Sequence, residues 1–131
     1  MATLYVASTE TFVGKSATCV GLIDRARRDG FSVGYMKPVS VSVTRTEGAV
    51  LDEDADFIRK HFGLKDAADK IAPVLMTQRV VESIIRGQGA DYAKRLNDAY
   101  LNVSRDKDLM VLEGANHWAE GSLVDLSADQ V

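Results

Sequence analysis

The chain contains a Gly-Lys-Ser sequence, Gly14-Lys15-Ser16, that could hold a phosphate group. An apolar run typical of a buried strand, residues 4–7, precedes it, and a helical pattern at residues 17–29 follows. In such a turn, backbone N–H groups and the positive end of the helix dipole point at one place. Lys15 would add a charge there, and the Ser16 hydroxyl could ligate a magnesium ion. The expected cradle is formed by Thr11, Phe12, Val13, Gly14, Lys15, Ser16 and Ala17.

The loop departs from the usual phosphate-loop pattern at one position. That pattern has a glycine five residues before the second glycine, where Thr9 stands here. A Gly-Lys-Ser sequence by itself is also compatible with an ordinary turn between a strand and a helix. The apolar strand before the loop and the amphipathic helix after it favour nucleotide or phosphate binding.

Two further residues with suitable chemistry follow apolar runs. Lys37 ends the run at residues 31–36 and precedes Pro38, and Glu113 follows the run at residues 109–112. Ligands of open parallel sheets bind beyond the carboxyl ends of the strands, so both residues are expected beside the loop. An acid in the position of Glu113 can orient the hydration shell of magnesium. The alternatives are a turn acid for Glu113 and a solubility-promoting lysine for Lys37.

Strands and amphipathic helices alternate along the chain. Gly30 is expected to end the first helix, Gly63 the second, and Thr77 to cap the third. The expected elements are strand 4–7, helix 15–29, strand 31–37, a Ser/Thr/Val-rich connection at 39–50 with no helical period, helix 52–62, a helix after Thr77 broken by Gly87 and Gly89, a helix carrying Tyr92 to Val103, and strand 109–112. This order predicts an α/β fold: a three-layer parallel sheet of the P-loop NTPase type, flanked by helices. The expected strand order is second, third, first.

The predicted sheet has three strands, whereas sheets commonly have about five or six. Ser127 has the character of a helix cap close to Val131. The sequence therefore favours a single domain, residues 1–131, that is an incomplete N-terminal portion of a longer protein. The apolar first strand would then lie at an exposed edge, which predicts homo-oligomers and contact with the remaining region of the protein.

Composition limits the classes of partner. The chain is 46% hydrophobic and 27% charged, as in ordinary globular proteins. Its net charge of −3 does not favour binding to nucleic acid or to an anionic membrane surface. No apolar run approaches the roughly 20 residues of a membrane span. The single cysteine, Cys19, excludes an internal disulfide and favours a cytoplasmic location. Its place on the apolar face of the first helix favours a core residue over a nucleophile.

Four motifs resemble dethiobiotin synthetase. They occur in the same order and are Thr9–Ser16, Val33–Val39, Asp54-Ala55 and Val111–Ala115. That family has a Gly-Thr-Asp-Thr-x-x-Gly-Lys-Thr loop, a Gly-x-x-Lys-Pro-Val strand end, an Asp-Ala pair and a Val-Glu-Gly-Ala-Gly-Gly strand end. The resemblance implies that Lys15 and Lys37 contact phosphate and substrate as catalytic residues. It also implies ATP and Mg²⁺ as cofactors, with Ser16, Asp54 and Glu113 as metal ligands.

The chain departs from the family pattern at three places. Ser8 replaces the first loop glycine, and Ala115-Asn116-His117 replaces the Gly-Gly on the substrate side. Asp56, two residues after Asp54, is an alternative candidate for the same metal-binding position. The chain is more similar to the N-terminal domain of long phosphate acetyltransferases and its stand-alone relatives. They share the Ser-Thr-Glu-Thr loop start, the stretch at 52–59 and the ending from Glu113-Gly114 to Glu120-Gly121. In those proteins this domain is thought to regulate or sense, and acetyl transfer belongs to a separate domain.

Three functional hypotheses follow. The favoured one is an ATP- and magnesium-binding regulatory or sensing domain. The second is an ATP-dependent ligase acting on a carboxylate or a carboxylated amine, in which Lys15 and Lys37 stabilise an acyl-phosphate transition state. The third is an interaction module with a vestigial phosphate loop. The replaced Gly-Gly argues against the ligase, and the retention of Gly14, Lys15, Ser16 and Glu113 argues against the vestigial loop.

Overall fold

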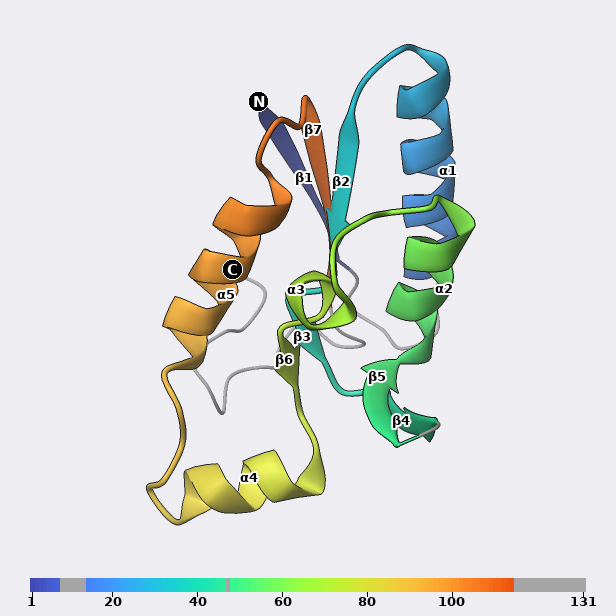
Figure 1. Ribbon diagram of the computed structural model, residues 1–131. Coiled ribbons are helices and arrows are strands. Elements are labelled where there is room, and N and C mark those ends of the chain that lie inside the picture. Colours follow the sequence, from blue (N-terminus) through green and yellow to red (C-terminus); the bar gives the residue numbers. More distant parts are fainter. Residues whose placement is uncertain (8–13, 47, 115–131) are drawn as a thin grey trace.

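The structure is a computed structural model that describes residues 1–7, 14–46 and 48–114 (Figure 1). The expected loop residues Thr11, Phe12 and Val13, the predicted cap Ser127 and the segment 115–117 lie outside these residues. The elements are β1 (Ala2–Val6), α1 (Lys15–Arg28), β2 (Val33–Met36), β3 (Val39–Ser40), β4 (Val43–Thr46), β5 (Ala49–Asp52), α2 (Glu53–His61), α3 (Ala68–Ile71), β6 (Val74–Leu75), α4 (Gln78–Ile85), α5 (Tyr92–Val103) and β7 (Leu109–Glu113).

The central sheet is parallel and has the order β1-β7-β2. This confirms the predicted strand order, in which the last strand lies between the first two. In register, Val6 pairs with Glu113 and Met36 pairs with Leu112, so all three strands end at nearly the same level. The loop after β1, Lys37 after β2 and Glu113 at the end of β7 therefore meet at one edge.

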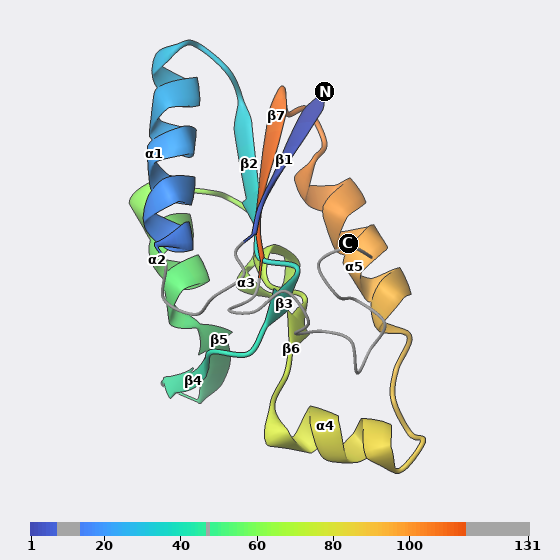
Figure 2. The same cartoon turned by 180° about the vertical axis from the view of Figure 1, so that it is seen from behind.

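The two faces of the sheet pack against different helices, as alternation along a strand requires. Tyr35 and Val111 face α1, where they pack with Cys19 and Ile23, and α2 extends the same layer. The alternate residues of the same strands, such as Met110, pack against α5 on the opposite face. Figures 1 and 2 show the sheet between α1 and α2 on one side and α5 on the other. The predicted three-layer α/β arrangement is confirmed.

Helix boundaries follow the expected capping chemistry. The side chains of Asp52, Thr77 and Asp91 accept hydrogen bonds from backbone N–H groups of the first turns of α2, α4 and α5. Such caps satisfy donors that the helix itself leaves unpaired. The cap at Thr77 was predicted, whereas Asp52 was predicted to be inside its helix. No helix in the described residues is both long and apolar enough to cross a membrane.

The connection at residues 39–50, for which the sequence predicted no helical period, forms short strands in its described part, and these strands were not predicted. β4 and β5 form an antiparallel hairpin, and β3 pairs in parallel with β6. Each strand of the β3–β6 pair has only two residues, which is too short for a recognisable alternation. Gly48, with φ of 80°, lies in the turn of the hairpin, in a conformation that glycine adopts without strain.

β1 pairs only with β7 among the described residues and so forms an edge of the central sheet. The side chain of Leu4 is 43% exposed there. Because an open apolar edge can pair with another chain, we expect the 131-residue chain to associate through β1. Replacing Leu4 with lysine should weaken this association, measured by analytical ultracentrifugation at high protein concentration. A monodisperse monomer of the unchanged chain would contradict the prediction.

Candidate nucleotide-binding site

The described part of the phosphate loop enters α1 through a left-handed residue. Gly14 has φ of 87° and ψ of 26°, a conformation that costs other residues free energy. Its carbonyl accepts hydrogen bonds from the Thr18 N–H and hydroxyl. Lys15 and Ser16 therefore occupy the first turn of α1, where the helix dipole favours an anion. Lys15 is buried, Ser16 is half-buried, and Ala17 is exposed in the same turn.

Two hydroxyl groups hold the carboxylate of Glu113. The Ser16 hydroxyl donates a hydrogen bond of 2.6 Å to Oε1, and the Tyr35 hydroxyl donates one of 2.5 Å to Oε2. Glu113 is only 2% exposed. The end of β7, the start of α1 and the middle of β2 thus meet at one carboxylate. The structure brings Ser16 and Glu113 together as the sequence predicted.

Tyr35 is a member of this cluster that the sequence analysis missed. Tyr35 pairs in register with Val111, and side chains two residues apart share a face, so Tyr35 and Glu113 both face α1. This period of two, applied to both strands, was the signal that could have found it. Burial, followed by the nearby Glu113 carboxylate, raises the pKa of Tyr35 well above its usual value, so Tyr35 remains a neutral donor.

Cys19 packs beneath the cluster as a core residue. It is fully buried, and burial together with the Glu113 charge raises the pKa of the thiol to about 12. A thiol with this pKa stays protonated near neutral pH and is a poor nucleophile.

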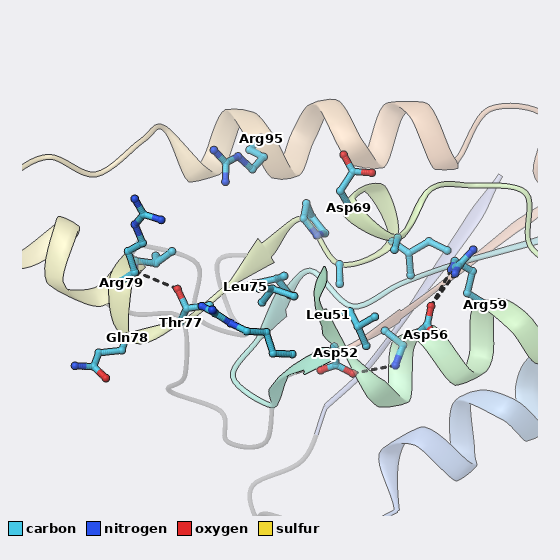
Figure 3. A pocket seen from close by; sticks show the side chains of 18 of the residues that line it. Leu51, Asp52, Asp56, Arg59, Asp69, Leu75, Thr77, Gln78, Arg79 and Arg95 are labelled. Atoms are coloured by element: carbon cyan, nitrogen blue, oxygen red, sulfur yellow. Dashed lines mark hydrogen bonds and ion pairs between the residues drawn. The ribbon is translucent and has the colours of Figure 1, made fainter. Parts of the chain in front are cut away.

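Lys37 lies in a second buried cluster. Its Nζ forms an ion pair of 2.8 Å with Oδ2 of Asp52, and the two side chains are 3% and 0% exposed. The Ser40 hydroxyl donates to the same oxygen, and the Ala55 N–H donates to Oδ1 at 2.9 Å. Figure 3 shows Asp52 where the hairpin meets α2. Asp52 therefore caps a helix and positions Lys37 at the same time.

Asp52 was not among the predicted site residues, and the structure does not bring the predicted acid to either cluster. Asp54 is exposed in the first turn of α2. Asp56 forms ion pairs with Arg59 at 2.8 Å and Lys60 at 2.9 Å, and hydrogen bonds from these two residues lower its pKa.

The donor set at Ser16 and Glu113 fits a magnesium ion that is completed by phosphate and water. Mg²⁺ prefers oxygen ligands and commonly takes only one or two carboxylates from the protein. A hydroxyl and a carboxylate oxygen lie 2.6 Å apart here. Among the described residues, no three histidine, cysteine or acidic side chains form a cluster that could hold a metal ion without such help.

Comparison with known proteins places these features in a family. Residues 2–131 match the AAA_26 family, described as an AAA domain. The chain is 30% identical over 113 residues to the ATP-dependent dethiobiotin synthetase of Aromatoleum aromaticum, covering 84% of this chain and 50% of that protein. It is 30% identical over 118 residues to the corresponding enzyme of Serratia marcescens, covering 87% and 51%.

A longer relative has a different activity. The chain is 29% identical over 113 residues to the phosphate acetyltransferase of Nitratidesulfovibrio vulgaris, covering 86% of this chain and 16% of that protein. The chain thus spans about half the length of the dethiobiotin synthetases it matches and a small part of the acetyltransferase. The parallel sheet, the phosphate-loop turn and these matches together show that the chain belongs to the AAA_26 family as a dethiobiotin synthetase-like P-loop domain.

Proposed function

We propose that this domain binds ATP with Mg²⁺ at the carboxyl edge of its sheet and serves as a regulatory or sensing domain. The observation that carries the proposal is the direct contact between the Ser16 hydroxyl and the Glu113 carboxylate beside the buried Lys15. A hydroxyl, a carboxylate and an ammonium group at a helix N-terminus are the groups that a magnesium-bound phosphate requires.

Each residue has a separate role in the proposed complex. Lys15 supplies positive charge to the phosphates, aided by backbone N–H groups of the first turn of α1. Ser16 and Glu113 would hold the metal, which neutralises phosphate charge when bound. Tyr35 keeps the carboxylate oriented. Lys37, fixed by Asp52, adds a second cation at the end of β2.

The role of Asp54 as a third metal ligand stays a prediction that its exposed position does not support. A direct comparison would test it. Substitution of Asp54 by asparagine should leave the magnesium dependence of ATP binding unchanged if Ser16 and Glu113 suffice.

A regulatory role is favoured over ligase chemistry by the sequence after Glu113. Ala115-Asn116-His117 stands where the dethiobiotin synthetase pattern has Gly-Gly. The match to a phosphate acetyltransferase over 16% of that protein is consistent with one domain in a larger enzyme. The ligase remains the alternative, because both Lys15 and Lys37 are retained and buried.

Measurement of phosphate release distinguishes a regulatory domain from an ATP-dependent ligase. The regulatory proposal predicts saturable ATP binding without phosphate release above background when carboxylates, or amines with bicarbonate, are added. The ligase predicts substrate-dependent release of phosphate, measured by a coupled assay. Such release, lost in Lys15→Ala, would overturn the regulatory proposal.

Substitution of Glu113 by glutamine should lower ATP affinity only when magnesium is present. The change removes the negative charge but keeps the shape of a side chain held by Ser16 and Tyr35. Calorimetric titration in magnesium and in EDTA measures the difference, and Glu53→Gln, an exposed acid in α2, is the matched control. An equal loss of affinity in both conditions would show a structural role instead.

A further inference from the structure

A large pocket lies beside the proposed nucleotide site but is built from other residues. It has a volume of about 890 Å³ and is lined by residues of the β4–β5 hairpin and of α2, α3, β6, α4 and α5 (Figure 3). Lys15, Ser16 and Glu113 are not among its lining residues. The volume is within the range of pockets that hold small organic ligands, about 300–1,000 Å³.

Among the charged side chains of the pocket that form no ion pair with described residues, arginines outnumber acids. Four arginines line it, and Arg59 is already paired with Asp56. The other three, Arg45, Arg79 and Arg95, form no ion pair with any described residue. The guanidinium carbon of Arg95 lies 5.3 Å from the centre of the Tyr92 ring.

The pocket's own acids do not balance these arginines. Asp52 is paired with Lys37, and Asp56 is paired with Arg59 and Lys60. Of the two remaining lining acids, Glu82 accepts a hydrogen bond from Gln78, and Asp69 forms no ion pair in the described residues. Three uncompensated arginines therefore face two acids that are not ion-paired.

Two of these arginines reach the same end of the pocket from different helices. Figure 3 shows the guanidinium groups of Arg79, from α4, and Arg95, from α5, directed towards that end. Both arginines are solvent-exposed, and an anion bound between them would interact favourably with two positive charges. The planar guanidinium fork matches a carboxylate with two parallel hydrogen bonds.

The uncharged residues that line the pocket indicate the chemistry of the rest of the ligand. Val50, Leu51, Leu75 and Val80 give the pocket an apolar surface. Thr77 accepts the Val80 N–H through its side-chain oxygen, which leaves its hydroxyl proton to donate. An anionic head with an apolar body would satisfy both the arginines and this surface.

We propose that this pocket binds a small organic carboxylate with an apolar chain, whose carboxylate is held by Arg79 and Arg95. The chain contacts the apolar wall towards the hairpin, and Arg45 adds positive charge from that side. This site is separate from the phosphate loop, so the proposal does not depend on ATP binding.

Titration of the purified protein with hexanoate tests the proposal. Its amide, hexanamide, has the same chain without the charge, and inorganic phosphate has the charge without the chain. At low ionic strength, where screening is weak, calorimetry should show saturable binding of hexanoate and much weaker binding of the other two. The double substitution Arg79→Gln and Arg95→Gln should reduce hexanoate affinity at least about tenfold, as loss of charge-assisted hydrogen bonds does.

Two control variants make the result specific. Arg86→Gln removes an exposed arginine at the end of α4 that does not line the pocket, and it should bind hexanoate normally. Lys15→Ala should also bind hexanoate normally, although it is expected to lose ATP affinity. The proposal is overturned if the unchanged protein does not bind hexanoate, or if the double variant binds it equally well. Binding that is lost in Lys15→Ala, or phosphate binding as tight as that of hexanoate, would also overturn it.

Discussion

Substitution of Lys15 by alanine is expected to weaken magnesium–ATP binding by about 2–3 kcal/mol, or roughly 30- to 150-fold, because it removes a charge-assisted contact to phosphate. Lys15 is buried in the first turn of α1, so its ammonium group is less screened by water than that of a surface lysine. The helix N-terminus and the metal remain in the variant, and for that reason binding should fall without disappearing. Calorimetric titration of both proteins measures the change.

A matched variant distinguishes this local contact from a general loss of positive charge. Lys94→Ala removes an exposed lysine from the first turns of α5 and should leave ATP affinity unchanged. Thermal melting of both variants shows whether the fold is retained. Equal ATP affinity of the unchanged protein and Lys15→Ala would mean that the Gly14–Ser16 turn is an ordinary connection between a strand and a helix.

The parts of the fold that could be predicted have strong local patterns. The helix at 15–29 shows clear periodicity, the strands around Val33 and Leu109 are apolar runs, and chain order with the handedness of crossovers then limits the sheet topology. The β4–β5 hairpin was missed because each strand has four residues. Four residues do not distinguish a half-buried strand from a loop rich in threonine and valine.

The site was predicted where a motif identifies a residue and missed where a tertiary contact does. Ser16 and Glu113 each belong to a motif and were found together. Asp52 is one of several acids in a short stretch, and only its contact with Lys37, 15 positions earlier in the chain, singles it out. The arginines of the pocket come from β4, α4 and α5, so no local pattern connects them.

The buried ion pair between Lys37 and Asp52 should make Asp52 one of the most sensitive positions for stability. Asp52→Ala leaves the Lys37 ammonium group buried without a counter-charge, which typically costs about 3–5 kcal/mol. It also removes the cap of α2, worth about 1 kcal/mol. Folded proteins are commonly stable by only about 5–15 kcal/mol, so we expect a fall in melting temperature of roughly 10–20 °C.

Three variants separate the contributions of charge and capping. Asp52→Asn can still cap α2 but cannot neutralise Lys37. If the ion pair dominates, this variant should therefore be destabilised nearly as much as Asp52→Ala. Adding Lys37→Met to Asp52→Ala removes both charges and should recover part of the stability, which a double-mutant cycle of urea unfolding measures.

Asp54→Ala, in the exposed first turn of the same helix, should change stability by no more than about 0.5 kcal/mol. Equal unfolding free energies for Asp52→Ala and Asp54→Ala would show that the Lys37–Asp52 pair does not stabilise the fold. The absence of any recovery on removing Lys37 would instead assign the loss to the cap, because the orphaned ammonium group would then carry no penalty.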